Sequence, residues 1–252
     1  MRSLRLSLFV AAVLQLNVAT LEGRSGTNLI PSGSTHVLFI GNSLTYTNDL
    51  PGTVSALAAS VGDTIRTRTV ALPDLALIDH VHGASDAMTV LRAERWDYVV
   101  LQQGPSSLPV NRDTLVLATV LLNPFIKATG ATSAQFMVWP ASNRPQDFPR
   151  VLESSQAAAR EVGGVMFAAG QAWANALAKD PSLPLYGADG YHPAPLGTYL
   201  AALVIYEGIT GHDARRLQAK AIVSGSELPV SPITVRMMQQ IAHETAAQYR
   251  AH

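Results

Sequence analysis

Three polar residues have the types and the order needed for a serine nucleophile and its base. Ser43 follows a short apolar segment, in GNSLT, where the pattern predicts a tight turn between a strand and a helix. Asp189 and His192 lie far along the chain in DGYHP. An aspartate three residues before a histidine can hold the imidazole Nδ1–H and leave Nε2 free as a base. Ser43 would supply the hydroxyl that this base activates.

Each of these motifs also has a purely structural interpretation. Ser43 can cap a turn, and Asp189 can cap the helix that follows it while His192 stays solvated. No G-x-S-x-G is present in the chain, which excludes the nucleophile elbow of the α/β-hydrolases. The combination of a strand-end serine with a later D-x-x-H favours the catalytic interpretation over the structural one.

Composition limits the chemistry further. The chain has 252 residues, 48% of them hydrophobic, with 18 basic and 18 acidic side chains and no cysteine. This content is enough for one sizeable core and excludes a disordered chain. A net charge of zero offers no basic surface for phosphates, which argues against a nucleic-acid partner. Without cysteine there is no disulfide, thiolate metal site or thiol nucleophile, so any nucleophile is oxygen or nitrogen.

The first twenty residues have the pattern of a signal peptide. Arg2 and Arg5 precede an apolar run at 6–16 that is too short to span a membrane. We therefore expect residues 1–20 to direct export, to the periplasm or out of the cell, with an uncleaved membrane anchor as the alternative. Residues 21–35 form a Gly- and Ser-bearing lead-in, and 36–252 form the domain. No other apolar stretch reaches spanning length, so we expect no stable membrane insertion after signal removal.

Short apolar runs alternate with longer amphipathic segments through the domain. Strands are predicted at 36–40, 64–70, 97–102, 134–139 and 164–169. Helices are predicted near 49–61, 75–93, 111–129, 149–162, 171–179 and 195–207. This alternation indicates an α/β fold, with a parallel sheet between two layers of helices. In such sheets the ligand crevice lies beyond the carboxyl ends of the strands.

A last helix is predicted to begin after Ser231. This serine can cap the helix, and Pro232 suits its first position. Its predicted apolar stripe contains Ile233, Met237, Ile241, Met238 and Ala242.

The two motifs resemble those of the SGNH (GDSL-type) hydrolase superfamily of serine esterases and lipases. GNSLT corresponds to the family's first block, and DGYHPAPLGTYLAALVIYEGITG is similar to its last. The resemblance implies a flavodoxin-like three-layer α/β/α sandwich with a five-stranded parallel sheet. It also implies Ser43 as nucleophile, His192 as base and then acid, and Asp189 as the group that orients the imidazole, with no cofactor.

The family's third block, a strand followed by G-x-N-D, is altered here. In DYVVLQQGPSS, Gly104 matches, but Ser106 stands where the family has an asparagine that helps to bind the oxyanion. Gln103 could supply an amide instead, or it could bond loop backbone. Because side chains alternate along a strand, Gln102 and Gln103 are expected to face opposite ways, so at most one reaches the site.

The second block, ALPDLALIDH, lacks the family's glycine. Asp74 lies near that position, and its backbone N–H could still donate to an oxyanion. Its carboxylate would be unfavourable beside a developing negative charge unless it points away or is paired. Asn42 also replaces the family's aspartate beside the nucleophile, which keeps an acceptor but removes a charge.

Four other residues have side chains that could serve a site. His80 and His82 are two apart and so do not share a helix face, and we expect no metal site. Trp139 could wall the pocket or belong to the core. Arg144 could meet an anionic substrate group or remain a solvated loop residue.

These observations favour an exported serine esterase that acts on carboxylic esters. The acyl group is expected to be short, and the substrate a small molecule or a carbohydrate. Two alternatives stay open: a glycan-binding domain with weak catalysis, and an enzyme that transfers the acyl group to a sugar.

Overall fold

Five parallel strands form the centre of the fold in a computed structural model that describes residues 33–250. The strands are β1 (Thr35–Gly41), β2 (Ile65–Ala71), β3 (Tyr98–Leu101), β4 (Thr132–Phe136) and β5 (Val165–Phe167). Their order is β2-β1-β3-β4-β5, the order of a flavodoxin-like sheet. The predicted parallel sheet is therefore confirmed. The predicted signal peptide at 1–20 and most of the lead-in at 21–35 lie outside the described residues.

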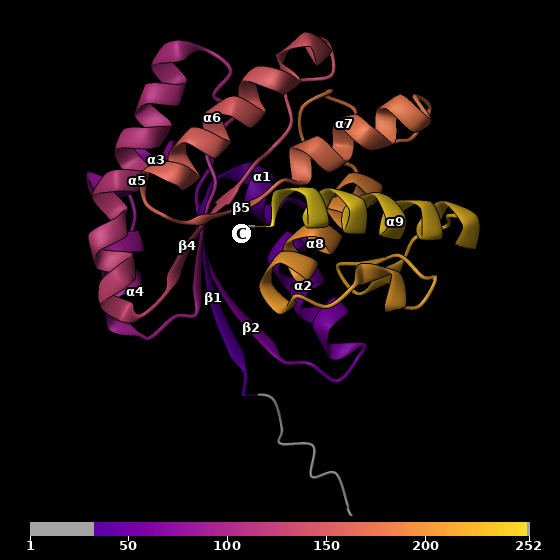
Figure 1. Cartoon of the computed structure of the whole chain (residues 1–252), viewed down its shortest axis with the longest axis horizontal. Helices are drawn as coiled ribbons and strands as arrows, with labels where there is room; N and C mark the ends of the chain where they lie inside the picture. Colours follow the sequence, from indigo (N-terminus) through magenta and orange to yellow (C-terminus); the bar gives the residue numbers. More distant parts are fainter. Residues whose placement is uncertain (1–32, 251–252) are drawn as a thin grey trace, which may run out of the picture. The chain divides into compact units, whose positions relative to one another are not determined.

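Helices cover both faces of this sheet (Figure 1). One face is covered by α2 (Leu50–Ala59), α7 (Ala169–Lys179), α8 (Pro195–Thr210) and α9 (Pro232–Tyr249). The other is covered by α3 (Leu77–Val81), α4 (Ala87–Ala93), α5 (Pro109–Thr129) and α6 (Phe148–Glu161). Strand β1 feeds both layers: Val37 and Phe39 pack on one side and Leu38 and Ile40 on the other, all fully buried. This is the predicted three-layer α/β/α sandwich.

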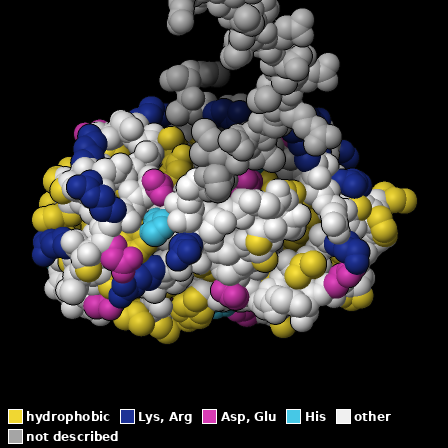
Figure 2. Space-filling model, turned by 90° about the horizontal axis from the view of Figure 1, so that it is seen from below, with side chains coloured by type: hydrophobic (Ala, Val, Ile, Leu, Met, Phe, Trp, Pro, Cys, Tyr) yellow, Lys and Arg dark blue, Asp and Glu magenta, His cyan; other side chains and the backbone are white. Residues whose placement is uncertain are grey.

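Short elements complete the described chain. They are α1 (Ser43–Tyr46), the 3₁₀ turns at Thr47–Asp49, Pro145–Asp147 and Ala214–Arg216, and the hairpin of β6 (Ile222–Val223) with β7 (Ser226–Glu227). Within residues 33–250, no helix has the length and apolar character needed to cross a membrane. On the face drawn in Figure 2, acidic side chains lie among basic ones, as the zero net charge suggests.

The single helix predicted at 75–93 is wrong, because the chain turns in the middle of that segment. Helix α3 ends at Val81, and Gly83 takes a left-handed φ of +89° that an L side chain rarely adopts. Ser85 then accepts a hydrogen bond from the N–H of Ala87, 3.1 Å away, and starts α4. Because apolar residues keep their helical spacing across this turn, the sequence pattern does not show the break between α3 and α4.

Helix α9 begins as predicted, but its buried face differs. The Ser231 hydroxyl caps the helix by accepting from the N–H of Thr234 at 3.1 Å. Ile233 is 82% exposed, so its inclusion in the apolar stripe is wrong. Helix α9 packs on α7 and α8 through a face that contains Val235, Met238, Ile241, Ala242 and Ala246.

Candidate active site

Ser43 stands at the carboxyl end of β1, at the first residue of α1. The preceding Asn42 caps this helix, because its side-chain oxygen accepts from the N–H of Leu44 at 3.1 Å. The Asn42 amide nitrogen also donates to the carbonyl of Leu75 at 3.0 Å, which ties this turn to the loop after β2. The N–H of Ser43 finds no acceptor within the described part of the chain, as is usual for the first turn of a helix.

Gln102, at the end of the neighbouring strand β3, braces this turn. Its side-chain oxygen accepts from the N–H of Asn42 at 2.8 Å and from the hydroxyl of Thr45 at 2.7 Å. Its nitrogen donates to the Asn42 side chain at 2.9 Å. A Cβ at Gly41 would lie 2.4 Å from the Gln102 oxygen, so a glycine is needed there. Gln102 and Gln103 do face opposite ways, as the strand pattern predicts.

His80 supports the same turn from α3. The imidazole is fully buried, with Nε2 lying 2.9 Å from the carbonyl of Gly41 and Nδ1 lying 2.7 Å from the Ser85 hydroxyl. Burial lowers the pKa of His80, although its bond to Gly41 acts in the opposite direction. A neutral ring that donates from Nε2 to the Gly41 carbonyl fits these contacts. His80 is therefore a structural support of the turn that bears Ser43.

Asp189 and His192 meet in the loop before α8. One Asp189 oxygen accepts from the N–H groups of Tyr191 and His192, at 2.9 and 3.0 Å. The other lies 2.5 Å from the His192 Nδ1. The bond to the His192 ring and then the Tyr191 N–H lower the pKa of Asp189 to about 2. The carboxylate is therefore ionised at neutral pH and orients the imidazole.

The structure brings the serine to this histidine. Ser43 Oγ lies 2.8 Å from His192 Nε2, although the two residues are 149 positions apart in sequence. Ser43, His192 and Asp189 thus form one continuous line of hydrogen bonds, which is the arrangement that lets an imidazole remove a serine proton.

Aromatic packing holds the loop that bears His192. The Trp139 indole N–H donates to the Tyr191 carbonyl at 3.0 Å, and its ring stacks on Trp173 with centroids 3.5 Å apart. Tyr186 anchors the same loop through its hydroxyl, which donates to the Pro140 carbonyl at 2.8 Å. Trp139 is fully buried. It therefore belongs to the core, and it acts on the site through the Tyr191 backbone.

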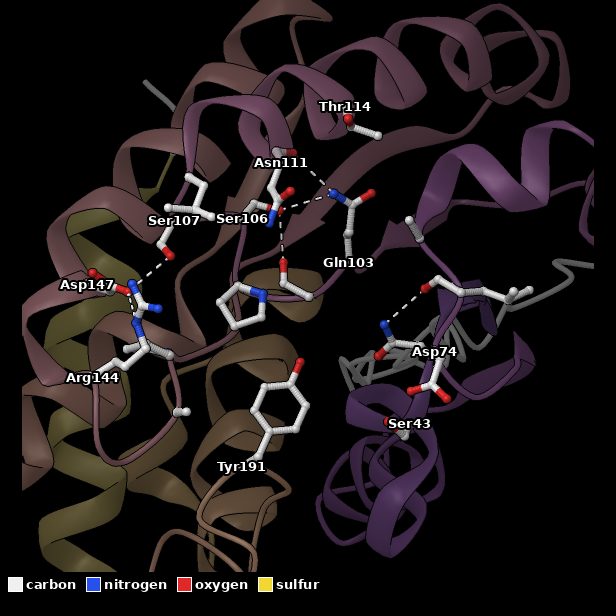
Figure 3. A pocket seen from close by; sticks show the side chains of 18 residues that line it. Ser43, Asp74, Gln103, Ser106, Ser107, Asn111, Thr114, Arg144, Asp147 and Tyr191 are labelled. Atoms are coloured by element: carbon white, nitrogen blue, oxygen red, sulfur yellow. Dashed lines mark hydrogen bonds and ion pairs between the residues drawn. The ribbon is translucent and has the colours of Figure 1, made fainter.

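A cavity of about 500 Å³ opens beside Ser43 at the carboxyl edge of the sheet (Figure 3). Asp74, Gln103, Ser106 and Arg144 all line it, whereas Trp139 does not. Tyr191, which the sequence analysis did not single out, points its side chain into the cavity from below in Figure 3.

Asp74 takes the backbone conformation that the missing glycine would favour. Its φ is +61°, in the left-handed region that aspartate tolerates better than most residues. Its backbone N–H has no acceptor among residues 33–250, and its side chain is exposed at the cavity. The loop after β2 thus presents this N–H close to the turn that bears Ser43, although Asp74 stands at the position where a glycine is expected.

Gln103 and Ser106 bond chiefly to each other. The Gln103 amide nitrogen donates to the Ser106 hydroxyl at 3.1 Å and to the Asn111 carbonyl at 3.3 Å. Its oxygen accepts from the N–H of Leu77 at 3.1 Å, and the Ser106 hydroxyl donates to the Gly104 carbonyl at 2.9 Å. Both side chains are buried in the cavity wall, and the structure joins neither of them to Ser43.

The fold is a three-layer α/β/α sandwich with a 2-1-3-4-5 sheet, and a serine, an imidazole and a carboxylate are hydrogen-bonded in line at the carboxyl edge of that sheet. No protein-family model and no curated protein matches the chain. Solved structures do match.

Among them is a proposed SGNH hydrolase from Slackia heliotrinireducens, at 26% identity and a TM-score of 0.60 over 69% of this chain and 98% of that one. A DUF4886 family protein from Bacteroides uniformis matches at 20% identity and a TM-score of 0.71, over 85% and 95%. An acetylxylan esterase from Geobacillus stearothermophilus matches at 17% identity and 0.53, over 72% and 96%.

The resemblance to the SGNH superfamily is thereby confirmed. These neighbours support a hydrolase of this fold.

Proposed function

We propose that this protein is an exported serine esterase that hydrolyses carboxylic esters of short acyl groups. The observation that carries the proposal is the line of contacts from Ser43 Oγ to His192 Nε2, 2.8 Å, and from His192 Nδ1 to Asp189, 2.5 Å. Three residues from two distant segments make the contacts that a nucleophile, a base and its orienting carboxylate require.

The reaction follows from this geometry. His192 Nε2 takes the hydroxyl proton as Ser43 Oγ attacks the ester carbonyl, and the ionised Asp189 stabilises the imidazolium that forms. Collapse of the tetrahedral intermediate transfers that proton to the leaving alcohol and leaves an acyl-enzyme. Water, activated by the same imidazole, then releases the acid and restores Ser43.

We assign the oxyanion to backbone donors. The N–H groups of Ser43 and Asp74 have no acceptor within residues 33–250 and lie at the same cavity. Donors of this kind contribute about 10²–10³ in kcat each when they are aimed at the developing charge. The predicted roles of Gln103 and Ser106 stay predictions, and their mutual bonds favour a supporting position in the wall.

Export and substrate class rest on separate support. The charged start and short apolar run of residues 1–20 suggest export. The mixed cavity lining includes polar side chains, among them Asn111, Thr114 and Arg144, that can bond the hydroxyls of a carbohydrate or another small alcohol, and one structural neighbour is an acetylxylan esterase.

The test is hydrolysis of nitrophenyl acetate by wild type and Ser43→Ala, with fluorophosphonate labelling of both. We expect Ser43→Ala to lower kcat by about 10³-fold or more and to abolish labelling. Ser60→Ala is the matched control, since among residues 33–250 that hydroxyl bonds just the Leu57 carbonyl at the end of α2. Equal activity in wild type and Ser43→Ala, with no label on wild type, would contradict the proposal.

The altered third block favours one second candidate, a member of the same fold with weak hydrolysis that binds a glycan or transfers an acyl group to a sugar. Ser106 in place of the family's asparagine removes one expected donor. Product analysis with an added sugar acceptor separates these outcomes, because transfer yields an acylated sugar where hydrolysis yields free acid.

A further inference from the structure

The cavity beside Ser43 is larger than a short acyl group needs. Its volume of about 500 Å³ lies in the range of sites that enclose whole small molecules. It extends from the nucleophile turn to the loop between β4 and α6, where Arg144 lies. The part remote from Ser43 is therefore available for the other half of an ester.

Arg144 is held in place by a buried carboxylate. Its Nε donates to Asp147 at 2.7 Å, and the same Asp147 oxygen accepts from the Ser107 hydroxyl at 3.1 Å. The Asp147 side chain is only 2% exposed, so this anchor is fixed. The two Nη groups of Arg144 have no acceptor in the described part of the chain. A guanidinium whose Nε is already bonded can still donate from both Nη groups to the two oxygens of a carboxylate.

The charge around this anchor is unbalanced. The second oxygen of Asp147 lies 3.7 Å from Arg150, so two guanidinium groups face one carboxylate. Arg150 does not line the cavity, whereas Arg144 does. Arg144, Asp147 and Arg150 together carry one excess positive charge, and Arg144 is the one of the two guanidinium groups that reaches the cavity. Asp74 supplies a negative charge at the Ser43 end.

Two neutral groups converge on the same space. The Tyr191 hydroxyl and the Asn111 side-chain amide line the cavity, and neither has a partner among residues 33–250. The Tyr191 hydroxyl lies close to Gly104, where an added Cβ would be 3.5 Å from it. Burial, with the charges of Asp74 and Asp189, raises the pKa of Tyr191, so its hydroxyl is a donor at neutral pH.

We propose that this cavity binds the alcohol part of the ester and that this alcohol is a sugar acid. Its carboxylate pairs with the Nη groups of Arg144, and its hydroxyls bond the Asn111 amide and the Tyr191 hydroxyl. The inference rests on the proposed esterase function and names the substrate class for that site.

The test compares two substrates that differ only in the acid group: glucose and glucuronic acid, each acetylated at the same hydroxyl. Acetate release gives kcat/KM for each. We expect wild type to prefer the acetylated glucuronate by about tenfold, a difference that one well-placed charged contact supplies. Arg144→Gln should bring the ratio close to one. Arg160→Gln is the matched control, and it should keep the preference because Arg160 is exposed in the last turn of α6 and does not line the cavity.

A second measurement does not depend on how a variant folds. Glucuronate should inhibit nitrophenyl acetate hydrolysis by wild type about tenfold more strongly than glucose, and added salt should weaken that inhibition. Equal inhibition, a wild-type ratio of one or below, or a ratio unchanged in folded Arg144→Gln would overturn the inference. If wild type fails to hydrolyse nitrophenyl acetate, or Ser43→Ala hydrolyses it equally well, the proposed function itself fails.

Discussion

Asp74 shows how one residue can preserve a site whose usual sequence has changed. Its left-handed backbone, with φ of +61°, keeps an N–H available at the cavity. The side chain, however, adds a carboxylate beside the place where negative charge would develop. If the proposed function holds, we expect the backbone conformation and the charge to have opposite effects on catalysis.

Asp74→Gly separates these effects. Glycine adopts positive φ without a steric cost and brings no charge, so we expect kcat for nitrophenyl acetate to rise several-fold. Asp74→Asn is the control, because asparagine tolerates the same backbone and also removes the charge. A similar rise in both variants assigns the effect to charge. A fall of about tenfold or more in Asp74→Gly would show that the carboxylate assists the reaction.

Asp189 is the second residue whose substitution has a defined expected outcome. With its pKa near 2, the carboxylate is charged throughout the neutral range and accepts from the His192 ring. Asp189→Asn should lower kcat by about 10⁴-fold with little change in KM, because an amide favours the wrong imidazole tautomer. Asp180→Asn is a matched control, since Asp180 caps Ser182 in the preceding loop. A loss below tenfold for Asp189→Asn would remove Asp189 from the mechanism.

At the scale of elements, the end of β1 is held from two sides. Gln102 reaches it from β3 and His80 from α3, and Gly41 makes the close approach of Gln102 possible. These contacts fix the turn on which Ser43 stands. The position of Ser43 therefore depends on β1, β3 and α3 as well as on the sequence of the turn itself.

The buried His80 should make stability depend on pH. Its pKa in the folded state is below the ordinary value of 6.5, so between these two values the unfolded chain binds more protons. The free energy of unfolding should therefore rise with pH up to about 6.5 and be flat above it for this group.

Urea unfolding of wild type and His80→Gln at about pH 5 and about pH 7.5 tests this. Glutamine can still donate to the Gly41 carbonyl but does not titrate, so the variant should lose less stability on acidification. The exposed His82 provides the control: His82→Gln should behave as wild type. Identical losses in wild type and His80→Gln would contradict the expectation.

At the scale of the molecule, the helical layer that contains α7 and α8 packs against the loop that carries His192. Trp173 lies in α7, stacks on Trp139, contacts Tyr186 edge-on and donates to the Gly197 carbonyl in α8 at 3.2 Å. Trp139 in turn holds the Tyr191 carbonyl. The loop that carries His192 is thus positioned by the packing of this layer.

Trp173→Ala should lower both stability and catalysis. Loss of a large buried ring costs about 3–5 kcal/mol of unfolding free energy, and the loop would lose its support. Trp96→Ala is the comparison, because Trp96 is buried in the opposite layer. We expect both variants to unfold more easily, but only Trp173→Ala to lower kcat under conditions where both are folded. Equal kcat in the two variants would show that the layer does not position the loop.

Much of the fold could be predicted because its signals are local. Alternating apolar runs and amphipathic segments indicated the parallel sheet, and GNSLT and DGYHP singled out Ser43, Asp189 and His192, which the structure places in hydrogen-bond contact. The split between α3 and α4 was missed because the apolar spacing continued through the turn at Gly83. The exposure of Ile233 was missed because a periodic stripe does not show where the contact with other helices begins.

The sequence by itself determined the class of fold and the two motifs that contain Ser43 and His192, because each depends on residues within a few positions of one another. Only the tertiary structure decided that Ser43 lies 2.8 Å from His192, that Gln102 braces the nucleophile turn and that Gln103 is bonded within the wall. It also placed Arg144, Asn111 and Tyr191 around one cavity. The reason is physical: these contacts join segments far apart in the chain, and packing of whole layers sets their distances.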